Sequence, residues 1–267
     1  SFNTQKHTVK FSSGLMNDHF EIAGRLSTLK SDGYVDRGAS DLKSYFLQGT
    51  YVGKTTLIKA LAFGGKEKTY QSWYGIDGET LANNRTFNFA GMFTDELGNA
   101  RFYDNETDNY QQDHYQLHWN EKVSKNWNTN LAFHYTKGKG YYEEYKEGAS
   151  FSNYGVNNYV SPNKDTVTST DLVRQKWLDN IYFGNFTSLD YNGTKLKLNA
   201  GIGATSYQGK HFGKVVWAEI AQPFGNDQNY YHTKSEKNEL NGYLKGAYTV
   251  YKGLNVLAEL QFRKINY

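Results

Sequence analysis

Aromatic and basic side chains gather in three stretches of this 267-residue sequence that lack a regular hydrophobic pattern. Many aromatic rings with a few cationic groups form a surface that stacks against an amphipathic small molecule and donates hydrogen bonds to it. About half of the rings are expected to pack against each other or at a lipid interface instead. The candidate ligand-binding residues are Trp73, Tyr74, Arg85, Phe87, Arg101, Tyr103, Tyr110, Tyr141, Tyr142, Trp217 and Tyr230.

Two short motifs suggest other chemistry but are incomplete. Gly53-Lys54-Thr55 resembles the end of a phosphate-binding loop, yet Gln48 stands where that motif requires a glycine. The acidic residues 104–108 could contact a cation, but they lack the glycine and the distal glutamate of a calcium-binding loop. A tight turn and a solvated loop are therefore the preferred interpretations.

Histidine spacing does not favour a metal site either. His114 and His118 would lie about 13 Å apart along one strand, which is too far for a single ion even with His134 on the next strand. The sequence contains no cysteine, no GxSxG motif and no defensible carboxylate pair. We therefore predict no cofactor, no metal and no catalytic residue, and interpret the chain as a non-enzyme.

The aromatic stretches are connected, and expected to be positioned, by segments in which polar and apolar residues alternate. The clearest pair lies within residues 109–145, where polar residues alternate with apolar ones at Tyr115, Leu117, Trp119, Leu131, Phe133 and Tyr135. Strict alternation predicts β-strands with one apolar and one polar face. A soluble sheet and a membrane barrel both produce this pattern, so the pair alone leaves the two open.

About ten such segments follow one another, and the connections between them alternate between short and long. Short turns are predicted near residues 17–18, 53–54, 124–127, 191–194 and 252–253, and longer loops near 30–41, 70–109, 140–171 and 208–229. Outer-membrane barrels have short periplasmic turns and long extracellular loops, whereas a soluble sandwich has no reason to alternate in this way. The predicted fold class is therefore all-β, an antiparallel transmembrane β-barrel.

Composition and charge agree with this prediction. The chain has 23 Tyr, 16 Phe and 26 Gly but only 2 Pro, and 38% of it is hydrophobic, which favours strands and turns over a helical core. The formal net charge is only +3 and acids separate the lysines, so no nucleic acid partner is expected. Charged residues in the middle of the predicted strands lie on the polar face, where a water-filled lumen would hydrate them. They are Glu21, Arg25, Lys197, Lys245, Glu259 and Arg263.

Several segments resemble the barrel of TonB-dependent outer-membrane receptors, particularly those of Bacteroides-type bacteria. They are GRLSTLKSDGYVDRGASDLKSYFLQGTY, DNETDNYQQDHYQLHWN, LAFHYTKGKGYYEEYK and GKHFGKVVWAEIA. The resemblance implies a barrel of about twenty-two strands around an N-terminal plug domain. Residues 1–267 would be one partial barrel domain of about ten strands, with both ends at the external face.

The resemblance also implies a function. The whole protein would sit in the outer membrane, in contact with its lipid, and import a scarce ligand: an iron–siderophore complex first, a glycan or cobalamin next. Energy for import would come from TonB through a plug region. Residues 1–267 show no match to the motif that contacts TonB. A surface lipoprotein is a further expected partner.

Two alternatives stay open on the sequence. A ten-stranded outer-membrane protease would close its first strand onto its last and place both termini on the periplasmic side. A soluble β-rich adhesin or lectin would have one wet sheet face without lipid.

Overall fold

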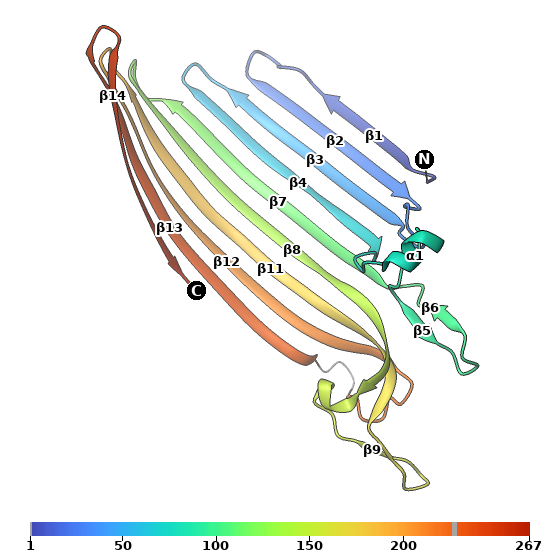
Figure 1. Cartoon of the computed structure of the whole chain (residues 1–267). Helices are drawn as coiled ribbons and strands as arrows, with labels where there is room; N and C mark the ends of the chain where they lie inside the picture. The colour runs from blue at the N-terminus through green and yellow to red at the C-terminus, as the bar shows by residue number, and fades with distance from the viewer. Residues whose placement is uncertain (1, 226–228) are drawn as a thin grey trace.

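The computed structural model describes residues 2–225 and 229–267 and contains one large antiparallel sheet (Figure 1). Ten strands pair in chain order, without crossovers. They are β1 (Gln5–Ser12), β2 (Phe20–Ser31), β3 (Ser40–Val52), β4 (Thr56–Tyr70), β7 (Thr107–Lys122), β8 (Trp127–Ser150), β11 (Ser169–Asn192), β12 (Leu196–Ala218), β13 (Asn229–Tyr251) and β14 (Leu254–Asn266). Within the described residues β1 does not pair with β14, so the sheet does not close into a ten-stranded barrel.

Short turns and long connections lie at opposite ends of the sheet, as the sequence predicts. The five short turns lie together at the upper left of Figure 1, and the longer connections lie at the lower right. Asn17 and Asp18 both adopt positive φ, 49° and 59°, in the first turn, and Gly253 does so in the last. Such left-handed residues match the twist of a tight hairpin. β1 begins near the long connections, whereas β14 runs toward that end and stops at Asn266, opposite Asn238 of β13 (Figure 1).

Two of the predicted loops are wrong in extent. β8 continues to Ser150 and β11 begins at Ser169, so the loop expected at 140–171 spans only 151–168. The loop expected at 208–229 begins after Ala218, and its residues 226–228 lie outside the described part. In these regions charged, aromatic and glycine residues interrupt the alternation of apolar and polar positions. Backbone pairing therefore continues where the alternating pattern disappears.

Large apolar side chains share one face of the sheet, the apolar face. The register aligns Ala62, Tyr115, Tyr135 and Phe183 on four adjacent strands. Tyr115, Tyr135 and Phe183 are 48%, 39% and 43% exposed in the chain by itself. Aromatic residues edge this band on the side of the short turns, at Phe20, Tyr51, Trp119, Trp127, Tyr191 and Tyr248. An exposed apolar band with an aromatic border is typical of a lipid-facing barrel wall.

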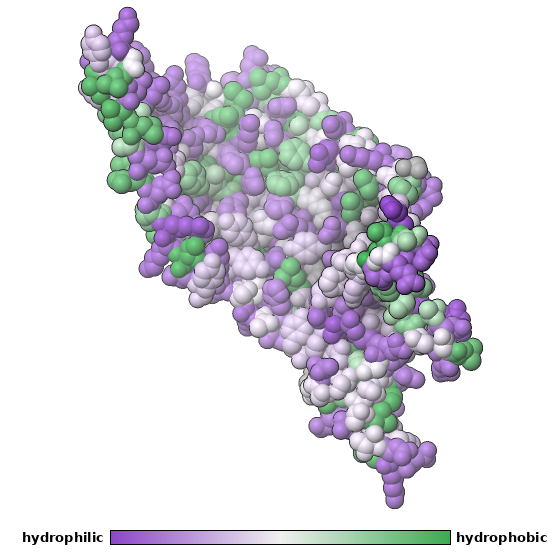
Figure 2. Space-filling view, in the orientation of Figure 1, coloured by the Kyte–Doolittle hydropathy of each residue, from purple (hydrophilic) through white to green (hydrophobic). Residues whose placement is uncertain are grey.

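The opposite face, the polar face, carries hydrophilic groups along the same strands. Figure 2 shows a hollowed side of the sheet covered mostly by hydrophilic and weakly polar side chains. Lys59, whose parity the sequence leaves ambiguous, aligns with Thr50 and His118 on this face. His114 bonds to Thr136 at 2.9 Å and stacks on Phe63. No group of three or more potential metal ligands occurs among the described residues.

The long connections contain small elements that the sequence analysis missed. They are α1 (Gly78–Asn83), the hairpin β5 (Met92–Thr94) and β6 (Ala100–Phe102), the 3₁₀ turn η1 (Phe151–Tyr154), and β9 (Tyr159–Val160) paired with β10 (Thr166–Val167). Asp77 caps α1 by accepting a hydrogen bond from the Thr80 N–H at 2.8 Å. None of the described helices has the length and apolarity needed to cross a membrane. Elements this short leave no periodic signal.

A charge introduced on the apolar face should destabilise the protein far more than the same charge on the polar face. Leu117→Arg on the apolar face should lower the unfolding free energy of the full-length protein in lipid vesicles by about 2–4 kcal/mol, because the charge enters hydrocarbon. Gln116→Arg, one residue away on the polar face, should change it by less than about 1 kcal/mol. Guanidinium titration followed by tryptophan fluorescence measures both, and equal effects would contradict the assignment of the faces.

Candidate functional site

A pocket lies at the end of the sheet that carries the long connections, where β3, β4, β7 and β8 meet residues 71–73. We call it the rim pocket. Its volume is about 770 Å³, within the range of small-molecule sites. The residues used below are Ser40, Thr69, Gln71, Trp73, Asp108 and Tyr142. Ser40, Thr69, Asp108 and Tyr142 share the polar face of four adjacent strands.

The indole of Trp73 is held in place by hydrogen bonds through Gln71. Its Nε1–H donates to Gln71 Oε1 at 2.7 Å, and Gln71 Nε2 donates to the Glu143 carbonyl at 3.1 Å. Gln71 is buried, whereas Trp73 is 68% exposed and lies 5.0 Å from the ring of Tyr74. A large exposed ring that is hydrogen-bonded to a buried residue offers a stacking surface at low entropic cost.

The other groups of the rim pocket supply hydrogen bonds and charge. Ser40 and Thr69 line the pocket with hydroxyls, and Lys176, which is not a lining residue, places its ammonium 5.5 Å from the centre of the Tyr142 ring. Partial desolvation raises the pKa of the Asp108 carboxyl, and a hydrogen bond from the Asn109 N–H opposes that rise. Hydroxyl donors, one carboxylate and two ring faces suit a hydroxyl-rich or aromatic ligand.

The long connection between β4 and β7, residues 71–106, is called the first connection here, and it is anchored to β8 through Glu143. This glutamate is only 5% exposed, and it accepts hydrogen bonds from Tyr103 Oη at 2.6 Å and from the Asn105 side chain. Gln175 Nε2 on β11 donates to its second oxygen at 2.6 Å. A buried carboxylate with all these donors is satisfied, so it fixes the loop to two strands.

A second buried carboxylate lies beside this anchor. Glu106 is 2% exposed, and its Oε2 accepts a hydrogen bond from the Tyr145 N–H at 2.9 Å. Burial raises the pKa of Glu106 to about 7; the Tyr145 hydrogen bond opposes the rise, and the nearby Glu144 adds to it. The loop therefore docks on β8 through a carboxyl of its own, whose pKa lies near neutral pH.

A charged pair lies next to these carboxylates on the polar side. Arg174 Nε and Nη2 both lie 2.8 Å from Glu144 Oε2, and Lys146 Nζ lies 3.3 Å from the other oxygen. Arg174 also donates to Tyr154 Oη at 3.3 Å, and Tyr154 packs edge-on against Tyr230. Sequence reasoning missed this cluster, because only the register places Arg174 opposite Glu144.

The structure brings some of the predicted ligand residues together. Trp73 and Tyr142 line the rim pocket, and Tyr74 stands beside Trp73. Tyr110 lies on the polar face over Gly138 and Gly140, where a Cβ at either position would collide with its ring. Tyr230 lies near Arg174, and within the described residues its buried hydroxyl has no hydrogen-bond partner.

Other predicted residues are placed elsewhere. Phe87 packs against Phe89 and Phe102 inside the first connection, and Tyr103 is part of the Glu143 anchor. Three more are separate from the pocket: Arg101 pairs with Asp95 at 2.8 Å, Tyr141 packs on Trp177, and Trp217 lies near Tyr145. Arg85 is exposed after α1. Tyr141, Tyr142, Trp217 and Tyr230 belong to strands rather than to the predicted loops.

Comparison with solved structures identifies the fold. The sheet matches the Ferric-Catecholate import receptor Fiu from E. coli K12 with a TM-score of 0.67 and 13% identity, over 99% of this chain and 43% of that one. It matches the ferripyoverdine receptor of the Pseudomonas aeruginosa outer membrane (TM-score 0.63, 8% identity, 100% and 36%) and the RagAB peptide transporter (0.64, 10%, 98% and 32%). The chain has the barrel fold of TonB-dependent receptors.

The match covers only part of those proteins, since the chain spans less than half the length of each of the three. No protein-family model matches the sequence, and no curated protein matches it. The similarity to the solved structures is therefore one of strand arrangement.

Glu106 predicts a pH dependence of loop docking. Because its pKa rises from an ordinary 4.5 to about 7 in the folded loop, the folded state binds the proton more tightly than the unfolded one. The free energy that holds residues 71–106 on β8 should therefore fall by about 3 kcal/mol as pH rises from about 4.5 to 7. Hydrogen-exchange protection of the Tyr145 amide measures this, and Glu106→Gln should abolish the dependence. Unchanged protection in the wild type would contradict it.

Proposed function

We propose that residues 1–267 form the barrel section of an outer-membrane receptor that captures a small ligand at the rim pocket. The observation that supports this most directly is the asymmetry of the sheet. One face is apolar and exposed, and only one end carries long connections with exposed aromatic rings. A receptor barrel likewise separates lipid from water and binds its ligand at one end.

The first proposed ligand is an iron–siderophore complex, and a glycan or cobalamin is the next. Structures with the same fold are named for ferric-catecholate, ferripyoverdine and ferric citrate. The rim pocket has the volume and the mixture of ring faces, hydroxyls and charge that a metal complex of an aromatic or hydroxylated chelator needs. A glycan would use the same rings and hydroxyls, so direct binding has to separate the two.

Transport by the whole protein belongs to the same proposal. We propose coupling to TonB through a plug region outside residues 1–267. We also propose a surface lipoprotein as a partner, since RagAB, a peptide transporter with this fold, has a partner lipoprotein. Transport rather than catalysis is favoured, because the proteins of similar fold are import receptors and transporters.

Ligand affinities of variants at adjacent residues test the position of the site. Tyr142→Ala should weaken the binding of a ferric catecholate probe by the full-length protein about tenfold, because a stacking ring is worth roughly 1–1.5 kcal/mol. Trp73→Ala should have a similar effect. Tyr141→Ala is the matched control, since that ring points to the other face and packs on Trp177. Fluorescence quenching measures the affinities, and equal losses for Tyr141 and Tyr142 would move the site away from the rim pocket.

A deletion tests the function itself. Cells that lack the gene should lose growth on ferric catecholate as the sole iron source, and the intact gene should restore it. Unimpaired growth on iron combined with lost growth on an oligosaccharide would replace the iron proposal with the glycan one. Normal growth on both, and on cobalamin, would contradict the receptor proposal.

A further inference from the structure

Lysines border the apolar face on the side of the long connections. On β3 and β4 the next residues outward on this face are Lys43 after Tyr45 and Lys66 after Gly64. The same step leads from Tyr135 to Lys137 on β8 and from Phe262 to Lys264 on β14. Four strands therefore change from apolar or glycine positions directly to a cation at the same border of the band.

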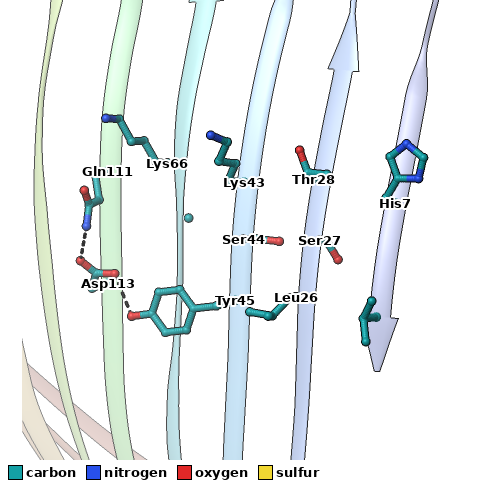
Figure 3. Close-up of a pocket in the computed structure, with 12 residues that line it drawn as sticks. His7, Leu26, Ser27, Thr28, Lys43, Ser44, Tyr45, Lys66, Gln111 and Asp113 are labelled. Atoms are coloured by element: carbon teal, nitrogen blue, oxygen red, sulfur yellow. Dashed lines mark hydrogen bonds between the residues drawn. The ribbon is translucent and has the colours of Figure 1, made fainter. Parts of the chain in front are cut away.

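Two of these lysines stand above a groove, shown in Figure 3. Its volume is about 480 Å³, and it extends over the apolar face of β1 to β4 and β7. We call it the lysine groove. Its apolar part is formed by Val9, Leu26 and Tyr45, and its polar part by Thr28, Lys43 and Lys66. The apolar part is continuous with the apolar band, because Val9, Leu26 and Tyr45 align in register on adjacent strands.

Two like charges face each other in the lysine groove. Lys43 and Lys66 are directly opposite each other on paired strands, an arrangement of like charges that destabilises a sheet. Both are exposed, and neither forms a salt bridge within residues 2–225 and 229–267. Asp113 also lines the groove, and its carboxylate accepts hydrogen bonds from Tyr45 Oη at 2.8 Å and from Gln111 Nε2 at 2.9 Å.

We propose that the lysine groove binds the phosphate headgroup of a lipid in the outer leaflet. The two ammonium groups would contact the phosphate, and the first part of an acyl chain would lie on Val9, Leu26 and Tyr45. A bound phosphate would also remove the repulsion between Lys43 and Lys66. This inference rests on the proposed membrane location of the barrel, and it adds a lipid site on the face opposite the rim pocket.

The test uses the full-length protein in an uncharged detergent, with short-chain phosphatidic acid as the probe and the matching diacylglycerol as its uncharged counterpart. Native mass spectrometry should show phosphatidic acid retained and diacylglycerol lost. The double variant K43Q/K66Q should weaken phosphatidic acid binding at least tenfold, whereas K43R/K66R should keep it. The control K10Q/K59Q removes two lysines from the polar face of β1 and β4 and should leave binding unchanged.

The results that would overturn the lipid site can be told apart from those that would overturn the barrel function. Equal affinity of the wild type and K43Q/K66Q, with both correctly folded by heat-modifiable electrophoretic mobility, would overturn the lipid site. Equally tight binding of inorganic phosphate alone would also overturn it, because the acyl chain would then contribute nothing. Flotation with phosphatidylcholine vesicles separates the two proposals: a protein that fails to insert contradicts the barrel function, whereas one that inserts without preferring phosphatidic acid contradicts only the lipid site.

Discussion

Hydrogen bonding between the backbones of ten antiparallel strands is the constraint on which the rest of this chain depends. Hydrocarbon offers no water to an N–H or a carbonyl, so a sheet that faces lipid must satisfy these groups between strands. The strands pair in consecutive order, and the outer sides of β1 and β14 are edges. Open edges of this kind agree with the match to a part of larger receptor barrels and not with a closed ten-stranded enzyme.

The same backbone continues beyond the apolar band and becomes the support of the candidate site. β8, β11, β12 and β13 each have more than twenty residues, longer than a bilayer crossing of about 9–11 residues requires. Their outer parts carry the buried glutamates Glu143 and Glu144, and Glu106 joins them from the first connection. That connection is therefore held by specific buried carboxylates, while Trp73 and Tyr142 remain free for contact at the rim pocket.

Similar folds at 8–13% identity have a physical explanation. Lipid accepts almost any apolar side chain, and water in the lumen accepts almost any polar one, so the fold constrains alternation and turn position more than residue identity. In the proposed function, specificity would depend instead on a few groups at the end of the sheet that carries the long connections. Different receptors can vary these groups on one scaffold, which is why fold alone does not give the ligand.

The sequence by itself determined the antiparallel order of strands, the positions of the five short turns and the two faces, because alternation and turn residues are local signals. The tertiary structure decided the rest. Only the folded chain brings Trp73 and Tyr142 to one pocket, and only the register places Arg174 opposite Glu144 and Lys43 opposite Lys66. It also moved Tyr141 and Trp217 out of predicted loops and away from the pocket. Contacts between distant strands depend on pairing offsets, and a pattern with a period of two residues does not encode them.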